Sequence, residues 1–211
     1  MLLSRYSAET DIVYGLTVSG RPAALAGVET MVGLFINTLP MRVQIPTDAS
    51  SLSWLKELQR RQLEMQQYEY SPLVRVQEWS EVARGVSLFE SILVVENYPV
   101  DASLRERKGG LRVSNVRSEE RTNYPLTVMA QPDQELLLKI AYDRRRFTDA
   151  SITRMLGHLQ TLLQGLTAWP QRLVGDLPLL TEAEHQQLLF EWNQTRTDYP
   201  SNRCIHQLFE E

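Results

Sequence analysis

The spacing of apolar and polar residues predicts several short strands. Residues 42–46 alternate with a period of two and stop at a proline, which is typical of a half-buried strand. Leu88–Tyr98 is the strongest strand prediction, because it is apolar and β-branched and ends in a turn sequence. Pro125 would place a strand over residues 121–128 at a sheet edge or a bulge. Further strands are expected at 11–21, which ends in a turn at 19–21, and at 111–116, 135–142 and 174–180, with another turn at 131–134.

Four segments have the pattern of helices. Residues 1–8 read as the end of a helix without a cap signal, which suggests an internal start or a truncation point. Amphipathic helices are predicted at 48–70, 148–166 and 181–193. The predicted caps are Ser50 or Ser51, Thr148 or Asp149, and Thr181 with Glu184 in a capping box. The apolar face of the first amphipathic helix should comprise Leu52, Leu55, Leu58, Leu63 and Met65 beside Trp54. Strands and helices in this order favour a layered α/β fold.

The chain is organised around residues 31–42, MVGLFINTLPMR. We expect the apolar run Val32–Ile36 to be a buried strand, interrupted by the amide of Asn37. A buried amide without hydrogen-bond partners costs roughly 1–3 kcal/mol, so such a residue usually belongs to a polar network or a site. Upstream, Gly20 permits a turn, and the guanidinium of Arg21 can bind several carbonyls at once.

Composition narrows the possible classes of protein. A net charge of −4 argues against a nucleic-acid-binding protein, and no apolar run is long enough to span a membrane. The first residues lack the apolar core of a signal peptide. One cysteine and three scattered histidines provide neither a disulfide framework nor a metal site. We therefore expect a reduced cytoplasmic protein that binds no metal, nucleic acid or membrane.

Two motifs in sequential order resemble the second half of the condensation domain of nonribosomal peptide synthetases. DIVYGLTVSGR follows the pattern DxVxGxxVSGR, and GLFINTLPMR follows GxFxNTLPxR. The resemblance continues in YEYSPL at 68–73, in LFESILVVENYP at 88–99 and in TNY at 122–124. The resemblance implies a chloramphenicol-acetyltransferase-like lobe, with a mixed α/β (α+β) sheet flanked by helices.

The resemblance also implies an activity. Condensation domains join an aminoacyl and an acyl or peptidyl thioester into an amide during secondary-metabolite synthesis, for example of antibiotics or siderophores. Carrier proteins present both substrates on phosphopantetheine arms, and the domain binds no cofactor directly. The catalytic signature HHxxxDG is absent from this chain and is expected to precede Met1. The chain alone is therefore expected to be inactive, and His158, His185 and His206 are expected to be packed or surface residues.

The resemblance assigns candidate site residues. Asn37, Thr38, Ser19 and Arg21 are candidates for lining the substrate tunnel, although Asn37 could instead make a structural hydrogen bond, and Ser19 and Arg21 could hold the loop. The residues expected to serve the structure are Gly20, Gly33, Arg42, Asn123 and Tyr124. For Arg144–Arg146 we favour a solvated turn over docking of an acidic carrier protein. The adjacent Glu119 and Glu120 are expected to be a solvated face.

The resemblance also divides the chain and implies its partners. Residues 1–170 would be the C-terminal lobe of a condensation domain, 171–200 a linker, and 201–211 the start of an adenylation domain. The expected partners are the N-terminal lobe, carrier proteins and the adenylation domain. The alternatives are an epimerisation-type relative, or a non-catalytic remnant or split half that binds a carrier protein. A lone lobe should expose an apolar patch and aggregate.

Overall fold

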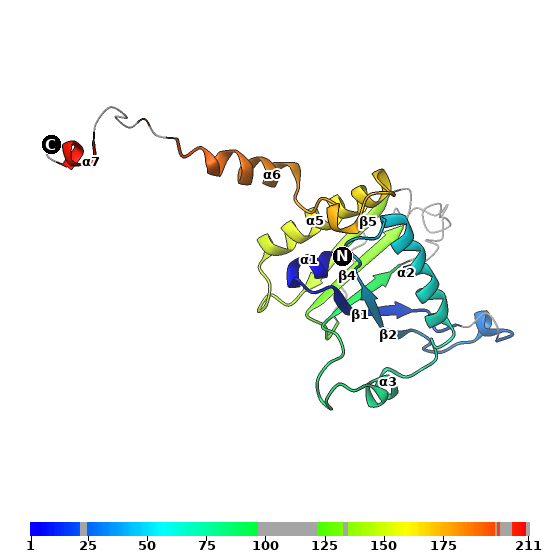
Figure 1. Cartoon of the computed structure of the whole chain (residues 1–211). Coiled ribbons are helices and arrows are strands. Elements are labelled where there is room, and N and C mark those ends of the chain that lie inside the picture. The colour runs from blue at the N-terminus through cyan, green and yellow to red at the C-terminus, as the bar shows by residue number, and fades with distance from the viewer. Residues whose placement is uncertain (22–24, 97–121, 133–134, 197, 199–203, 210–211) are drawn as a thin grey trace, which may run out of the picture.

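The structure is a computed structural model that describes residues 1–21, 25–96, 122–132, 135–196, 198 and 204–209. A five-stranded mixed sheet has the order β2-β1-β3-β4-β5. The strands are β1 (Asp11–Val18), β2 (Asn37–Gln44), β3 (Ser91–Val95), β4 (Leu126–Pro132) and β5 (Leu136–Tyr142). β1, β3 and β4 are mutually parallel, and β2 and β5 run antiparallel at the two edges. The mixed α/β sheet that we predicted is confirmed (Figure 1).

Helices cover one face of this sheet (Figure 1). They are α1 (Leu2–Ser7), α2 (Ser51–Gln66) and α5 (Asp149–Ala168). The remaining helical segments are α3 (Leu73–Trp79), α6 (Glu182–Leu189), α7 (Ile205–Phe209) and the 3-10 turns η1 (Val28–Thr30), η2 (Val174–Asp176) and η3 (Glu191–Asn193). Across the described parts of the chain, no helix combines the length and apolarity needed to cross a membrane.

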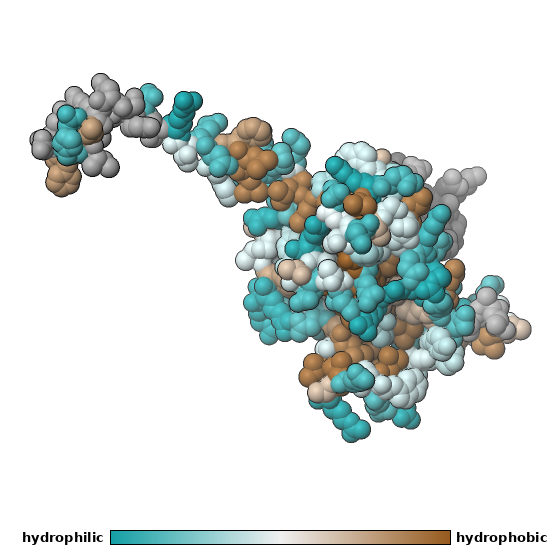
Figure 2. Space-filling model, viewed as in Figure 1, coloured by the Kyte–Doolittle hydropathy of each residue, from teal (hydrophilic) through white to brown (hydrophobic). Residues whose placement is uncertain are grey.

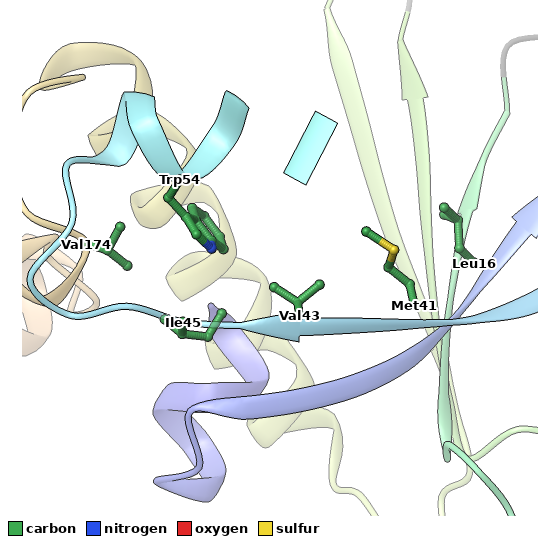
Figure 3. Packing of buried hydrophobic residues seen from close by; sticks show 6 residues of the cluster. All are labelled: Leu16, Met41, Val43, Ile45, Trp54 and Val174. Carbon is green, nitrogen blue, oxygen red and sulfur yellow. The ribbon is translucent and has the colours of Figure 1, made fainter. Parts of the chain in front are cut away.

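The main hydrophobic cluster lies between the sheet and α2. Its buried members are Leu16, Met41, Val43, Ile45, Trp54 and Val174 (Figure 3). Met41 and Val43 alternate with exposed polar residues in β2, as the period-two pattern predicted. A second cluster joins Leu126 of β4 to Ile152 and Met155 of α5. The sheet and its helices therefore form one layered unit, with both hydrophobic clusters on the face that the helices cover.

The predicted helix caps are confirmed. The Ser50 hydroxyl accepts a hydrogen bond from the Ser53 amide at the start of α2, and Thr148 serves α5 in the same way. Thr181 and Glu184 form the full capping box of α6. The predicted apolar face of α2 is only half right. Trp54, Leu58 and Met65 pack on the core, whereas Leu52, Leu55 and Leu63 are exposed, because the sheet contacts only one stripe of the helix.

Residues 172–181, which we call the strap, do not form the strand that we predicted. Val174–Asp176 form a 3-10 turn, and the only strand-like pair here is the isolated bridge between Leu173 and Ser50. The reason is that the strap's backbone binds elsewhere: the Val174 amide donates to the Ala49 carbonyl at 2.9 Å. The Arg5 guanidinium also donates hydrogen bonds to the strap, at the carbonyl oxygens of Val174 and Gly175.

The prediction that Pro125 marks a sheet edge or a bulge is wrong. Strand β4 begins at Leu126, just after Pro125, and lies inside the sheet between β3 and β5. Pro125 therefore leads into an interior strand rather than marking an edge, so its missing N–H interrupts no ladder. The edge strand that does contain a proline is β2, with Pro40.

The run Val32–Ile36 is not a buried strand. It precedes β2 as a loop, and the side chains of Val32 and Leu34 are 104% and 92% exposed. Both lie away from the clusters under α2 and α5, so the described residues provide no core for them. The apolar patch that we predicted concerned a face of the sheet, so these loop residues do not test it, and it stays a prediction. The predicted strand 111–116 and Glu119–Glu120 lie outside the described residues.

Candidate functional site

The sheet brings the four tunnel-lining candidates together at one end. The register pairs Val18 with Asn37 and Thr17 with Thr38, so the end of β1 lies beside the start of β2. Ser19 and Arg21 follow β1 directly. The carboxyl end of β3, which is parallel to β1, lies at the same end of the sheet. Loops after the carboxyl ends of parallel strands are common places for binding sites.

Asn37 is clamped onto the turn between α2 and α3. Its Nδ2 donates to the carbonyl oxygens of Glu69 at 2.9 Å and Ser71 at 2.8 Å. Its Oδ1 accepts from the Thr38 amide at 2.9 Å. These bonds use both amide protons, so the side chain keeps one acceptor lone pair for any other partner. The polar network expected for this amide is present, and its tunnel-facing role stays a prediction.

Gly20 and Arg21 hold the loop that connects β1 to β2. Gly20 has a φ of +62°, and a Cβ built there would lie 1.8 Å from the Phe35 carbonyl oxygen, so only glycine fits. The Arg21 guanidinium donates to the Val28 carbonyl and, at 3.1 Å, to the Met31 carbonyl. It also lies 4.1 Å from the centre of the Phe35 ring. The prediction that this guanidinium binds several carbonyls is confirmed.

Replacing Arg21 with glutamine should loosen this loop. Glutamine has a shorter, uncharged side chain and cannot reach both carbonyls while stacking on Phe35. The amides of Thr30 and Met31, which close the η1 turn, should exchange with deuterium about tenfold faster, corresponding to the loss of a charged hydrogen bond. Hydrogen exchange followed by mass spectrometry measures this. Arg60→Gln on the exposed face of α2 is the control, and equal exchange in both variants would refute the role of Arg21.

Arg42, Asn123 and Tyr124 lie at the other end of the sheet, whereas Gly33 lies in the loop before β2, beside the Phe35 ring. Arg42 forms a bidentate ion pair with Asp11, whose pKa is lowered by this hydrogen bond. Asn123 and Tyr124 precede β4, and the Tyr124 ring stacks on Phe89 at 5.3 Å. These residues lie at the entry to β4 and beside β1, away from Asn37.

The basic run Arg144–Arg146 lies in the turn between β5 and α5, beside Asn123 and Tyr124. The three side chains are 80%, 89% and 52% exposed, and each has a carboxylate neighbour. Arg145 binds Asp143 at 2.8 Å and lowers the pKa of that carboxyl to about 2. The solvated turn that we favoured agrees with this arrangement.

The three histidines differ in their exposure to solvent. His158 is buried in α5, and His185 and His206 are exposed. In the described part of the chain, no three His, Cys, Asp or Glu side chains are grouped as a metal site would need. The sequence left open whether His158 is packed or on the surface, and it did not predict its partners, Tyr6 and Glu184, which lie 152 and 26 residues away along the chain. The capping-box pattern had singled out Glu184 for its local role alone.

Comparison with known proteins identifies the sequence family. The family model described as "Condensation domain" matches residues 1–189. The chain is 49% and 52% identical to linear gramicidin synthase subunits C and D of Brevibacillus parabrevis, over all 211 residues. It is 40% identical to bacitracin synthase 3 of Bacillus licheniformis. The chain spans only 3–4% of the length of these relatives.

Solved structures show the same fold. A four-domain nonribosomal peptide synthetase bound to AMP and glycine superposes with a TM-score of 0.71 and 19% identity, over 87% of this chain and 15% of the other. The starter condensation domain of the rhizomide synthetase, in a mutant form, gives a TM-score of 0.66 and 18% identity, over 85% and 42%. The expected chloramphenicol-acetyltransferase-like architecture is confirmed. This chain belongs to the condensation-domain family of nonribosomal peptide synthetases.

Proposed function

We propose that this chain is the C-terminal lobe of a condensation domain that forms peptide bonds between carrier-tethered thioesters. The observation that carries this proposal is the similarity over all 211 residues to synthases of peptide antibiotics. In the reaction, the amine of the acceptor aminoacyl group attacks the donor thioester carbon. The C–N bond forms, the C–S bond breaks, and the donor phosphopantetheine leaves as a thiol. The product belongs to secondary metabolism.

The proposed contribution of this lobe is the acceptor side of the tunnel. Asn37, Thr38, Ser19 and Arg21 lie together at one end of the sheet, next to the apolar loop that includes Val32–Ile36. An apolar surface beside polar groups suits a substrate arm with amide groups. The catalytic histidine would come from an HHxxxDG motif outside these residues. Substrates would arrive on the phosphopantetheine of carrier proteins, with no cofactor bound to the lobe itself.

The proposed boundaries follow from the resemblance. Residues 171–200 would link the lobe to an adenylation domain that begins within 201–211. The hydrogen bonds that residues 172–177 make to Ala49 and Arg5 support a linker whose first part packs on the lobe. A synthetase of this kind would work in the cytoplasm, with the N-terminal lobe, the carrier proteins and the adenylation domain as its partners.

Reconstitution tests the proposed reaction. The chain would be combined with an N-terminal lobe that carries HHxxxDG, a donor carrier protein loaded with a peptidyl group and an acceptor carrier loaded with an amino acid. We expect the peptide to appear on the acceptor carrier, as detected by mass spectrometry of the intact carrier. A lobe with the second histidine changed to alanine is the control, and this chain alone should form no product.

The same assay separates the alternatives. An epimerisation-type relative would exchange the α-hydrogen of the carrier-bound residue with deuterated water and form no new amide. A non-catalytic remnant would bind a carrier protein and form no amide with any histidine lobe. Either result would contradict the proposed function.

A further inference from the structure

The strap lies directly on α5 because two glycines leave room for it. A Cβ on Gly165 would lie 3.3 Å from Cδ2 of Leu177, and a Cβ on Gly157 would lie 3.3 Å from Cγ2 of Thr181. These glycines are eight residues apart, so they lie near the same stripe of the helix. The strap therefore follows α5 closely as far as the first turn of α6.

Helix α1 binds the same strap from the other end of the sequence. The Arg5 guanidinium donates to the carbonyl oxygens of Val174 at 3.2 Å and Gly175 at 2.6 Å. Val174 itself is 1% exposed and belongs to the main core cluster. Hydrogen bonds thus join α1, near the N-terminus, to the strap, which directly precedes α6 in the sequence.

A buried histidine joins α1, α5 and α6. His158 is 4% exposed, its Nδ1 lies 2.8 Å from the Tyr6 hydroxyl, and its Nε2 lies 2.9 Å from Oε2 of Glu184. An ionised carboxylate can only accept, so Nε2–H donates to Glu184, and in the neutral imidazole Nδ1 accepts from the Tyr6 O–H. The charged neighbour at this position is Arg154, 3.6 Å from Oε1 of Glu184.

Glu184 also holds the first turn of α6. Its Oε2 accepts from the Thr181 amide at 3.0 Å and from the Thr181 hydroxyl at 2.8 Å. Partial burial raises the pKa of Glu184, but the hydrogen bonds from Thr181 and His158 outweigh it, so the pKa lies below its usual value. One carboxylate therefore both caps α6 and attaches it to His158.

Beyond this point α6 leaves the body of the protein. Figure 1 shows the helix pointing away from the sheet, and Figure 2 shows apolar side chains gathered along it. Residues 185–193 are exposed, among them Leu189 at 53% and Trp192 at 64%. Among the described residues, Glu184 links α6 to the body of the protein by a hydrogen bond to His158 and an ion pair with Arg154.

We infer that the hydrogen bonds joining Tyr6, His158 and Glu184 fix the direction in which α6 leaves the body of the protein. His158 acts as the central link, because its two ring nitrogens connect helices from distant parts of the sequence. In the synthetase proposed above, α6 leads towards the adenylation domain, so these three side chains would determine the position of that domain relative to the sheet. The geometric inference itself does not depend on the proposed function.

A distance measurement tests the inference. Spin labels would be placed on cysteines introduced at Gln187 in α6 and Gln59 in α2, both exposed, with Cys204 changed to serine. We expect a narrow distance distribution in the parent and a broader one in His158→Leu, which leaves the capping box untouched. Amides of α6 should exchange about tenfold faster in the same variant. Glu182→Gln, exposed in the same helical turn, should change neither measurement.

Three further variants make the test specific. Glu184→Ala should broaden the distribution, and Glu184→Gln should restore it, because the amide oxygen still accepts from Nε2–H. Tyr6→Phe, on a half-exposed side chain, keeps the result interpretable if His158→Leu fails to fold, and it should broaden the distribution too. A distribution as narrow as the parent's in Tyr6→Phe and His158→Leu, with broadening in Glu184→Ala alone, would reduce Glu184 to a local cap and overturn the inference. The test uses no peptide formation, so its failure is distinct from failure of the proposed function.

Discussion

Asn37→Leu is expected to destabilise the protein by about 2–4 kcal/mol, because the carbonyls of Glu69 and Ser71 lose their donor. Leucine has the same number and branching of side-chain heavy atoms as asparagine, so the loss reflects hydrogen bonding and not a cavity. The part-buried carbonyls would face an apolar side chain, and the turn between α2 and α3 would separate from β2. Chemical denaturation followed by tryptophan fluorescence measures the free energy of unfolding.

Gln44→Leu is the matched control for Asn37→Leu. Gln44 lies at the other end of the same strand with an exposed side chain, so its replacement should change stability by no more than about 0.5 kcal/mol. Equal stability of the two variants would show that the hydrogen bonds from Asn37 to Glu69 and Ser71 contribute nothing to the free energy of unfolding. A stable Asn37→Leu lobe that fails to support amide formation would instead assign Asn37 to the tunnel.

Trp54→Ala should have the largest effect, about 3–5 kcal/mol, which is a large share of the total stability of a typical domain. The ring is 7% exposed and fills the space between α2 and β2 in the main cluster. Its Nε1 donates to the Gln44 carbonyl at 3.0 Å, so alanine leaves both a cavity and an unpaired acceptor. Thermal unfolding followed by circular dichroism would show the loss.

Two variants separate the parts of the Trp54 effect. Trp54→Phe keeps much of the ring and loses the N–H, so it should cost less than alanine. Trp79→Ala removes a ring of the same type that is 73% exposed on α3, and it should leave the unfolding temperature nearly unchanged. Similar losses from the Trp54 and Trp79 variants would contradict the assignment of the core.

Local chemistry allowed the helix starts and the β2 alternation to be predicted. Capping by Ser50, Thr148 and Thr181 depends on residues three positions apart, so the sequence contains the whole signal. The hairpin of β4 and β5 is equally local. The pairing of β1 with β3 joins Gly15 to Ile92, and no short-range pattern indicates it. The resemblance to a known family, not periodicity, predicted the overall fold.

The site was harder to predict for the same reason. An amide in an apolar run indicated that Asn37 needs partners, yet the partners are backbone carbonyls 32 and 34 residues away, which have no side-chain signature. The apolar run Val32–Ile36 was predicted to be a buried strand because its residues are hydrophobic. Hydrophobicity alone does not show which surface, if any, of the same chain covers them. In the structure all of that run except the half-buried Phe35 is exposed.

The strap has a consequence for how the protein is made. Arg5 binds carbonyls 169 and 170 positions later, and Val174 completes the main cluster beneath Trp54. A ribosome releases the chain from the N-terminus, so α1, the sheet and α2 all emerge before the residues that close their core. During that interval the nascent chain exposes an unfinished apolar interior, and contacts this distant in sequence form slowly. Completion of the core therefore waits until residues 172–181 have left the ribosome.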